Sequence, residues 1–257
     1  MYWYESGALT LAGRALVASL LAGLASGLGG LLVVLLPRLT RRAYDTMLAF
    51  SAGVMFSAAA LALLWPALET GSLAAVTSGL FTGGLLILAL EKLVPHLEPH
   101  FAPEMMNSQR GRFGLLLAAA ITLHNIPEGL AIGVSYAHGQ GEFGLVVALA
   151  IAAQKVPEGS AVALPFYTHG YGRLRPFLWA TLSGLVQPVA AAAGFHLVAL
   201  THGLVPFGLA AAAGAMVYVA SHQLVPESHS EPGRKAPSLA LLAGFLLVAV
   251  LLHWLAA

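Results

Sequence analysis

Two short segments of the chain carry side chains that could bind a metal ion. Residues 124–129 read HNIPEG, and thirty positions later residues 154–159 read QKVPEG. In each segment the first residue and the glutamate are four positions apart, so on a helix both side chains project from one face. Imidazole, carboxylate and amide groups suit Zn²⁺, Fe²⁺, Mn²⁺ or Cd²⁺ better than Cu⁺, which favours sulfur. The residues concerned are His124, Glu128, Gln154 and Glu158.

The composition indicates that these segments lie inside a membrane. The chain has 257 residues, of which 58% are hydrophobic and only 9% are charged, whereas soluble domains carry about 25% charged residues. Stretches of about 20 apolar residues are long enough to cross the hydrocarbon core. We therefore predict an all-α polytopic membrane protein with one transmembrane domain over residues 1–257. Its eight helices are expected at about 9–36, 43–66, 72–94, 113–137, 143–168, 176–200, 206–226 and 238–256.

The basic residues predict how the chain is oriented. Ten of the twelve lysines and arginines fall in or beside the four loops on one side of this arrangement. The positive-inside rule makes that side cytoplasmic, with both termini extracytoplasmic and the chain in the cell (inner) membrane, surrounded by lipid bilayer. The ten are Arg38, Arg41, Arg42, Lys92, Arg110, Arg112, Arg173, Arg175, Arg234 and Lys235. Of the other two, Arg14 lies near an outer helix end, and Lys155 lies inside the predicted helix 143–168.

The depths of the polar residues in the membrane predict that the two segments meet. The helices 113–137 and 143–168 are consecutive and must run antiparallel, which places His124 level with Glu158. Glu128 and Gln154 then form a second level about 6 Å further out. Ionisable groups at the bilayer centre are costly, so their clustering predicts a bound cation or another function.

The prolines and glycines of the two motifs suggest a path for an ion. Pro127 and Pro157 each remove one backbone hydrogen bond, so we expect kinked or broken helices at these positions. Gly129 and Gly159 let neighbouring backbone come close. Broken helices near the bilayer centre are typical of transporters that expose a site alternately to each side.

The remaining patterns separate two functions. The chain has no cysteine, which excludes disulfides and thiolate metal ligands, and no GxxxxGK[ST] segment for ATP. We expect no nucleic-acid partner and no resident cofactor. A divalent metal transporter is the leading hypothesis, and the alternative is an intramembrane zinc-dependent hydrolase. The segment HNIPEG lacks the HExxH pattern of such hydrolases, and both sites lie beside prolines, which favours passage of an ion over catalysis.

The sequence resembles the ZIP (Zrt-, Irt-like protein) family of divalent metal transporters, particularly its bacterial branch. The strongest matches are LHNIPEGLAIGVSYAHG at 123–139 and AQKVPEGSAVALPFY at 153–167. Further similar segments are AFSAGVMFSAAAL at 49–61, LVPHLEPH at 93–100 and AAGAMVYVASHQLVPESH at 212–229. The resemblance implies an eight-helix bundle that moves zinc, or a broader set of divalent metals, toward the cytoplasm.

The resemblance also implies a set of ligands. The primary site of the family corresponds to His124, Glu128 and Glu158, with Gln154 nearby. The second site of the family often uses Asn125 together with two carboxylates, but this chain has Lys155 and Gln187 at those positions. We therefore hypothesise that the Lys155 ammonium replaces the second cation, so that the site holds one metal. The alternative is that Lys155 extends toward a wet vestibule.

Other residues are candidates for a metal pathway. The segment before LVPES has Ser221, His222 and Gln223 where the family commonly has acidic residues. His222 could accept metal near the inner mouth together with Glu91 and His96, and Met55 matches a pathway position of the family. The predicted loop 95–112 is either a weak metal-collecting segment or simply solvated; its candidate ligands are His96, Glu98, His100, Glu104, Met105 and Met106. Faces rich in small residues on the first, third and sixth helices permit a homodimer.

Overall fold

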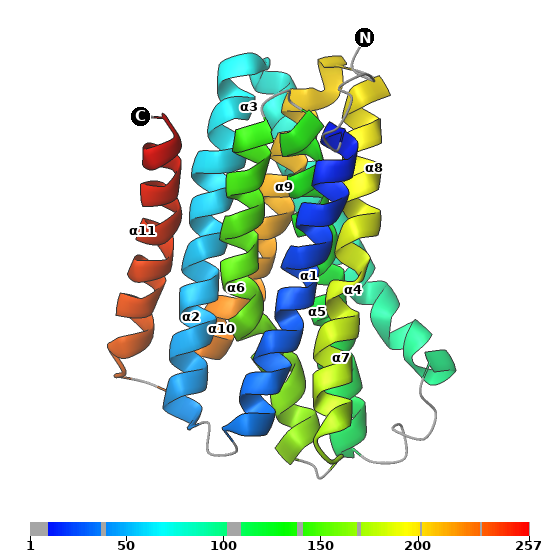
Figure 1. The fold of residues 1–257 in the computed structure, drawn as a ribbon, viewed down its shortest axis with the longest axis vertical. Coiled ribbons are helices and arrows are strands. Elements are labelled where there is room, and N and C mark those ends of the chain that lie inside the picture. Colours follow the sequence, from blue (N-terminus) through cyan, green and yellow to red (C-terminus); the bar gives the residue numbers. More distant parts are fainter. Residues whose placement is uncertain are drawn as a thin grey trace.

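The protein is a bundle of long antiparallel helices (Figure 1). The computed structural model describes residues 10–36, 40–101, 109–137, 141–168, 171–200, 202–231 and 233–256, and no strand occurs among them. The helices are α1 (Leu11–Leu35), α2 (Arg41–Ser57), α3 (Trp65–Thr70), α4 (Leu73–Phe101), α5 (Gln109–Ala137), α6 (Gly141–Thr168), α7 (Leu174–Gly184), α8 (Val186–Leu200), α9 (Val205–Val219), α10 (Val225–Ser228) and α11 (Ala236–Ala256). A short 3₁₀ segment, η3 (His202–Leu204), precedes α9.

These elements form eight rods, where a rod is one helix or a run of consecutive helical segments, and they correspond to the eight predicted helices. The π-helical segment η1 (Ala58–Leu64) joins α2 to α3, and η4 (Ala220–Leu224) joins α9 to α10. The helices α7 and α8 form one further rod with an interruption at Leu185. Within the described residues, seven rods are long and apolar enough to cross a membrane, and α5 is the eighth rod. The predicted all-helical polytopic fold is therefore confirmed.

Some predicted helix limits are wrong. The helix α4 continues to Phe101 and α5 begins at Gln109, so much of the segment predicted as the loop 95–112 is helical. Hydropathy marks the part of a helix that lies in hydrocarbon, and a helix does not have to stop where its apolar part stops. The rod from α2 to α3 extends past its predicted end for the same reason, reaching Thr70.

The helix interruptions lie in other rods than the sequence predicted. The helical backbone of α5 continues through Pro127, and that of α6 continues through Pro157. One interruption is at Leu185, three residues before Pro188, which has no N–H to donate to the carbonyl of Gly184. The π-helical segments η1 and η4 are two more irregularities, and such segments often occur at functional positions.

Glycines set the closest helix pairs. The most extensive contacts join α1 with α6, α4 with α9, α5 with α8, and α2 with α11. Each pair has one glycine from each helix against the backbone of the other, as the small-residue packing of membrane helices predicts. A Cβ atom at Gly159 would lie 1.9 Å from the carbonyl oxygen of Ser26. The pairs are Gly29 with Gly159, Gly83 with Gly214, Gly133 with Gly194, and Gly53 with Gly244.

The contacts divide the helices into two groups. The site group consists of α1, α5, α6, α7 and α8, which pack mainly on one another. The wall group consists of α2, α4, α9 and α11, together with the short segments that continue α2 and α9. The helix α11 stands at one edge of the bundle beside α2 (Figure 1). Contacts of α2 with α6, and of α9 and α4 with α5, join the two groups.

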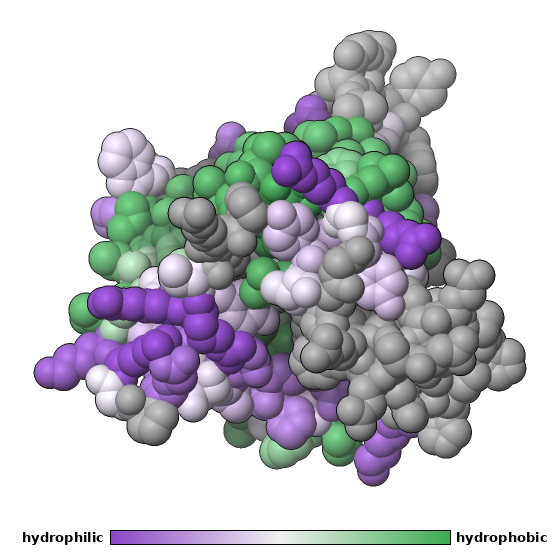
Figure 2. Space-filling model, turned by 90° about the horizontal axis from the view of Figure 1, so that it is seen from below, coloured by the Kyte–Doolittle hydropathy of each residue, from purple (hydrophilic) through white to green (hydrophobic). Residues whose placement is uncertain are grey.

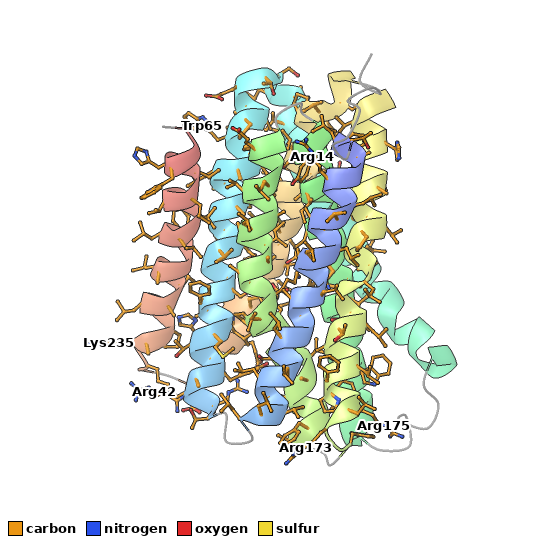
Figure 3. The ribbon with its side chains drawn as sticks, viewed as in Figure 1. Arg14, Arg42, Trp65, Arg173, Arg175 and Lys235 are labelled. Atoms are coloured by element: carbon orange, nitrogen blue, oxygen red, sulfur yellow. The ribbon has the colours of Figure 1, made fainter. Side chains whose placement is uncertain are left out.

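Basic side chains gather at one end of the bundle. Figure 3 shows Arg42, Arg173, Arg175 and Lys235 at the end opposite to Arg14 and Trp65. Viewed from the basic end, hydrophilic side chains spread over the end face, and hydrophobic surface lies along part of its rim (Figure 2). The helix α1 begins and α11 ends toward the other end (Figure 1).

An ion-pair network ties α2 to the connection between α10 and α11 at the basic end. The buried Asp45 pairs with Arg41 at 2.8 Å and with Arg234 at 3.1 Å. Arg41 also pairs with Glu227 at 2.8 Å.

Adjacent glycines of α4 offer a test of the packing. A Cβ atom at Gly83 would lie 1.8 Å from the carbonyl oxygen of Ala211, whereas one at Gly84 would be no closer than 3.7 Å to any neighbouring atom. We expect Gly83→Ala to lower the free energy of unfolding by about 1–3 kcal/mol, because the backbones must separate. Gly84→Ala should cause no loss. Unfolding in detergent micelles measures both variants, and equal losses would contradict the close backbone packing.

Candidate metal site

The antiparallel helices α5 and α6 bring the two motifs together inside the site group. Every polar side chain assigned to the site is buried, with relative exposures between 0% and 3%. The side-chain amide of Gln154 donates to Oε1 of Glu128, as the predicted common depth of these residues requires. The buried residues are His124, Asn125, Glu128, Gln154, Lys155, Glu158 and Gln187.

Lys155 lies between the two carboxylates. Its Nζ donates to Oε2 of Glu158 at 2.5 Å and pairs with Oε2 of Glu128. The same ammonium also donates to Oδ1 of Asn125. Lys155 is 0% exposed, so the alternative in which it extends toward a wet vestibule is wrong. Burial of an unpaired charge is costly, and these contacts compensate for it.

Asn125 and Gln187 hold this arrangement from the neighbouring rods. The Nδ2 of Asn125 donates to the carbonyl oxygen of Ser183 at 2.7 Å, next to the interruption between α7 and α8. The Nε2 of Gln187 donates to Oε2 of Glu128 at 3.1 Å. Asn125 and Gln187, which the sequence assigned with Lys155 to a second site or to charge replacement, therefore contact the charged cluster.

Three buried polar atoms of the cluster have no hydrogen-bond partner within the described part of the chain: Nε2 of His124, Oε1 of Gln154 and Oε1 of Gln187. All three belong to side chains that can ligate divalent metals. Among the described residues, no three His, Asp or Glu side chains are arranged to hold an ion. The carboxylates instead bind Lys155 and the amides, so coordination of a metal requires them to turn toward the unpartnered atoms.

The sequence did not identify Ser51 of α2 as part of the site. Its hydroxyl donates to Oε1 of Glu158 at 3.0 Å, and the residue is fully buried. A serine gives no sequence signal of its own: Ser57 of the same helix is equally buried, yet its hydroxyl has no hydrogen-bond partner in the described part of the chain. The contact depends on how α2 lies against α6.

The predicted pathway residues fall into different environments. Met55 is buried in the apolar core. Glu91 accepts hydrogen bonds from the Tyr218 hydroxyl at 3.0 Å and from the Gln223 amide, and Gln223 also interacts with His124. Gln223 therefore connects Glu91 to the site. The exposed His222 packs against the Tyr218 ring, with centroids 5.2 Å apart. The side chain of His96 lies outside the described part of the chain, as do those of Glu98, His100, Glu104, Met105 and Met106.

Comparison with known proteins identifies the family of the chain. The family model described as ZIP Zinc transporter matches residues 103–252, which include both motifs. The chain belongs to the ZIP family. It is 41% identical over 248 residues to the zinc transporter GufA of Myxococcus xanthus, covering 93% of this chain and 98% of that one. It is 38% identical over 261 residues to the zinc transporter ZupT of Chlorobium phaeovibrioides, with 94% and 98% coverage. It is also 36% identical over 234 residues to ZIPB of Bordetella bronchiseptica, with 87% and 75% coverage.

ZIP membership confirms the resemblance read from the sequence and decides between the two hypotheses. This chain is a metal transporter and not an enzyme, and the comparisons give no support to the hydrolase alternative. In a ZIP transporter the metal is the cargo, not a cofactor.

The charge balance of the cluster predicts that removal of the Lys155 ammonium strongly lowers the stability of the metal-free protein. We expect Lys155→Met to lower the stability of the metal-free protein by about 3–5 kcal/mol, because Glu128 and Glu158 lose their buried counter-charge. Adding Glu128→Gln to this variant should restore part of the loss. The exposed Lys235→Met is the matched control and should behave like wild type. Unfolding in detergent, with metal chelated, measures the difference; similar stability of all variants would contradict the ion-pair assignment.

Proposed function

We propose that the protein carries Zn²⁺, or Zn²⁺ with Cd²⁺, Fe²⁺ or Mn²⁺, across the membrane toward the cytoplasm through the cluster between α5 and α6. The observation that carries this proposal is a buried pair of carboxylates, Glu128 and Glu158, beside unpartnered atoms of His124 and Gln154. Zinc sites take four such nitrogen and oxygen ligands. Membership in the ZIP family supports zinc as a cargo, since the relatives described above are named zinc transporters.

In this proposal the cargo binds at His124, Glu128, Gln154 and Glu158. The Nε2 of His124 and the Oε1 of Gln154 are buried and have no hydrogen-bond partner among the residues that the structure describes, which fits a cation better than a closed hydrogen-bond network. The two carboxylates supply the charge that a divalent ion needs. They have to turn only within the cluster, because they already contact Gln154 and Lys155.

The same proposal limits the site to one metal ion. Lys155 contacts both carboxylates, and its ammonium supplies positive charge where a second cation would otherwise lie. Asn125 already uses both amide atoms, one with Lys155 and the other with Ser183. Gln187 offers an amide in place of a charged ligand.

Movement between the helix groups would open the site alternately to each side. The cluster is sealed in this conformation, because its residues are at most 3% exposed. Close glycine contacts hold the helix pairs together within each group, so we infer that the groups move against each other as units.

The basic end of the bundle is the cytoplasmic end in this proposal. Arg42, Arg173, Arg175 and Lys235 lie there, opposite to the end at which α1 begins and α11 ends (Figures 1 and 3). By the positive-inside rule both termini are extracytoplasmic, and the chain resides in the cell (inner) membrane. The homodimer that the small-residue faces permit stays a prediction.

Uptake measurements test the transport proposal. Proteoliposomes with the wild-type protein should take up Zn²⁺ with saturation, and Glu158→Ala should reduce the rate at least tenfold, because the ion loses a charged ligand. Glu142→Gln removes an exposed glutamate from the same helix and should leave uptake unchanged. Wild-type vesicles that take up no more metal than empty vesicles would contradict the proposal.

Metal content tests whether the site holds one ion. Purified wild-type protein equilibrated with Zn²⁺ should bind one ion per chain at this site, measured by elemental analysis against protein concentration. Lys155→Asp replaces the ammonium with a carboxylate and should raise the number to two. A second ion beside Glu128 and Glu158 in the wild type would show that Lys155 does not replace a cation.

A further inference from the structure

Glu158 is held by both helix groups at once. Its Oε2 accepts from Lys155, three residues earlier on α6, at 2.5 Å. Its Oε1 accepts from the hydroxyl of Ser51 on α2 at 3.0 Å. Lys155 belongs to the site group and moves with Glu158, whereas Ser51 belongs to the wall group. The hydrogen bond of Ser51 therefore crosses the boundary along which the two groups would move.

We propose that Ser51 is a positioning residue that latches the metal-free site group to the wall group through Glu158, and that a divalent cation bound by Glu158 releases this latch. The proposal rests on the transport function proposed above. It assigns a role to a residue of α2 that is not itself one of the proposed ligands.

The release follows from the charge of the carboxylate. A hydroxyl binds an ionised carboxylate more strongly than a neutral acceptor, because the acceptor carries a full charge. A divalent cation on Glu158 takes up that charge and weakens the bond. The carboxylate also has to turn toward the unpartnered Nε2 of His124, whereas Ser51 is fixed on another helix.

The latch would couple cargo to movement. A ligand shifts a conformational equilibrium only by its different affinity for the two states. The hydrogen bond of Ser51 to Glu158 exists in the empty, latched state and opposes metal binding, so it supplies such a difference. When the hydrogen bond of Ser51 is absent, metal binding no longer has to break a contact between the two helix groups.

Helix α2 contains its own control. Ser57 is fully buried, six residues from Ser51, but its hydroxyl has no hydrogen-bond partner among the described residues. Ser57→Ala removes a buried hydroxyl from α2 without touching Glu158. Ser51→Thr keeps a hydroxyl at the latch position.

Zinc affinity tests the latch. Titration of purified protein with Zn²⁺ should show tighter binding by Ser51→Ala than by wild type, on the order of tenfold, since a hydrogen bond to a charged group no longer opposes the ion. Ser51→Thr and Ser57→Ala should bind like wild type. Unchanged or weaker binding by Ser51→Ala overturns the latch. If the wild type itself binds no Zn²⁺, the proposed function fails instead.

Thermal unfolding gives a second readout that does not depend on a stable metal-free variant. Loss of the latch destabilises the empty state more than the loaded state, so Zn²⁺ should raise the Tm of Ser51→Ala by more than it raises the Tm of wild type. A variant too unstable to purify without metal should be recovered when Zn²⁺ is present throughout. An equal Tm rise in both proteins, or unfolding that Zn²⁺ does not relieve, overturns the proposal.

Discussion

Two carboxylates buried side by side in a bundle of apolar helices repel each other, and each has lost its hydration. The ammonium of Lys155 offsets both the repulsion and the lost hydration, because it contacts Glu128 and Glu158. It also donates a hydrogen bond to Asn125. Neighbouring polar side chains stabilise these buried charges further. The amide groups of Gln154 and Gln187 donate hydrogen bonds to the Glu128 carboxylate, and the hydroxyl of Ser51 donates one to the Glu158 carboxylate. The result, within the described residues, is a cluster with paired charges in which buried atoms of His124, Gln154 and Gln187 have no hydrogen-bond partner.

The glutamate and the glycine of each PEG motif have separate tasks. Glu128 and Glu158 supply the charge of the cluster, whereas the adjacent glycines let the next rod approach. A Cβ atom at Gly129 would lie 2.5 Å from the carbonyl oxygen of Gln187, and one at Gly159 would lie 1.9 Å from that of Ser26. The motif therefore places a charged residue and a close backbone contact one residue apart, which keeps the carboxylates deep inside the site group.

The sequence predicted the eight rods and the meeting of α5 with α6, because hydropathy and the spacing of the polar residues determine both. It also placed Lys155 on the helix that carries Gln154 and Glu158, and the resemblance to the ZIP family led to the hypothesis that its ammonium replaces a second cation. It could not predict the contact of Ser51, because that contact depends on how α2 lies against α6 in the folded bundle. The interruption at Leu185 follows from the missing N–H of Pro188, a local signal that the sequence contains but that the helix prediction did not use, and the extra length of α4 lies beyond its apolar part.

The charge of the cluster has a consequence for energetics. Two carboxylates and one ammonium leave one net negative charge on the empty site, and a divalent ion changes it to one net positive charge. If the site travels between the two sides of the membrane, a potential that is negative inside favours inward movement of the loaded form and outward return of the empty form. Each elementary charge that crosses contributes about 2.3 kcal/mol per 100 mV. The resting voltage of the cell would thus assist both halves of the cycle, which a neutral site could not achieve.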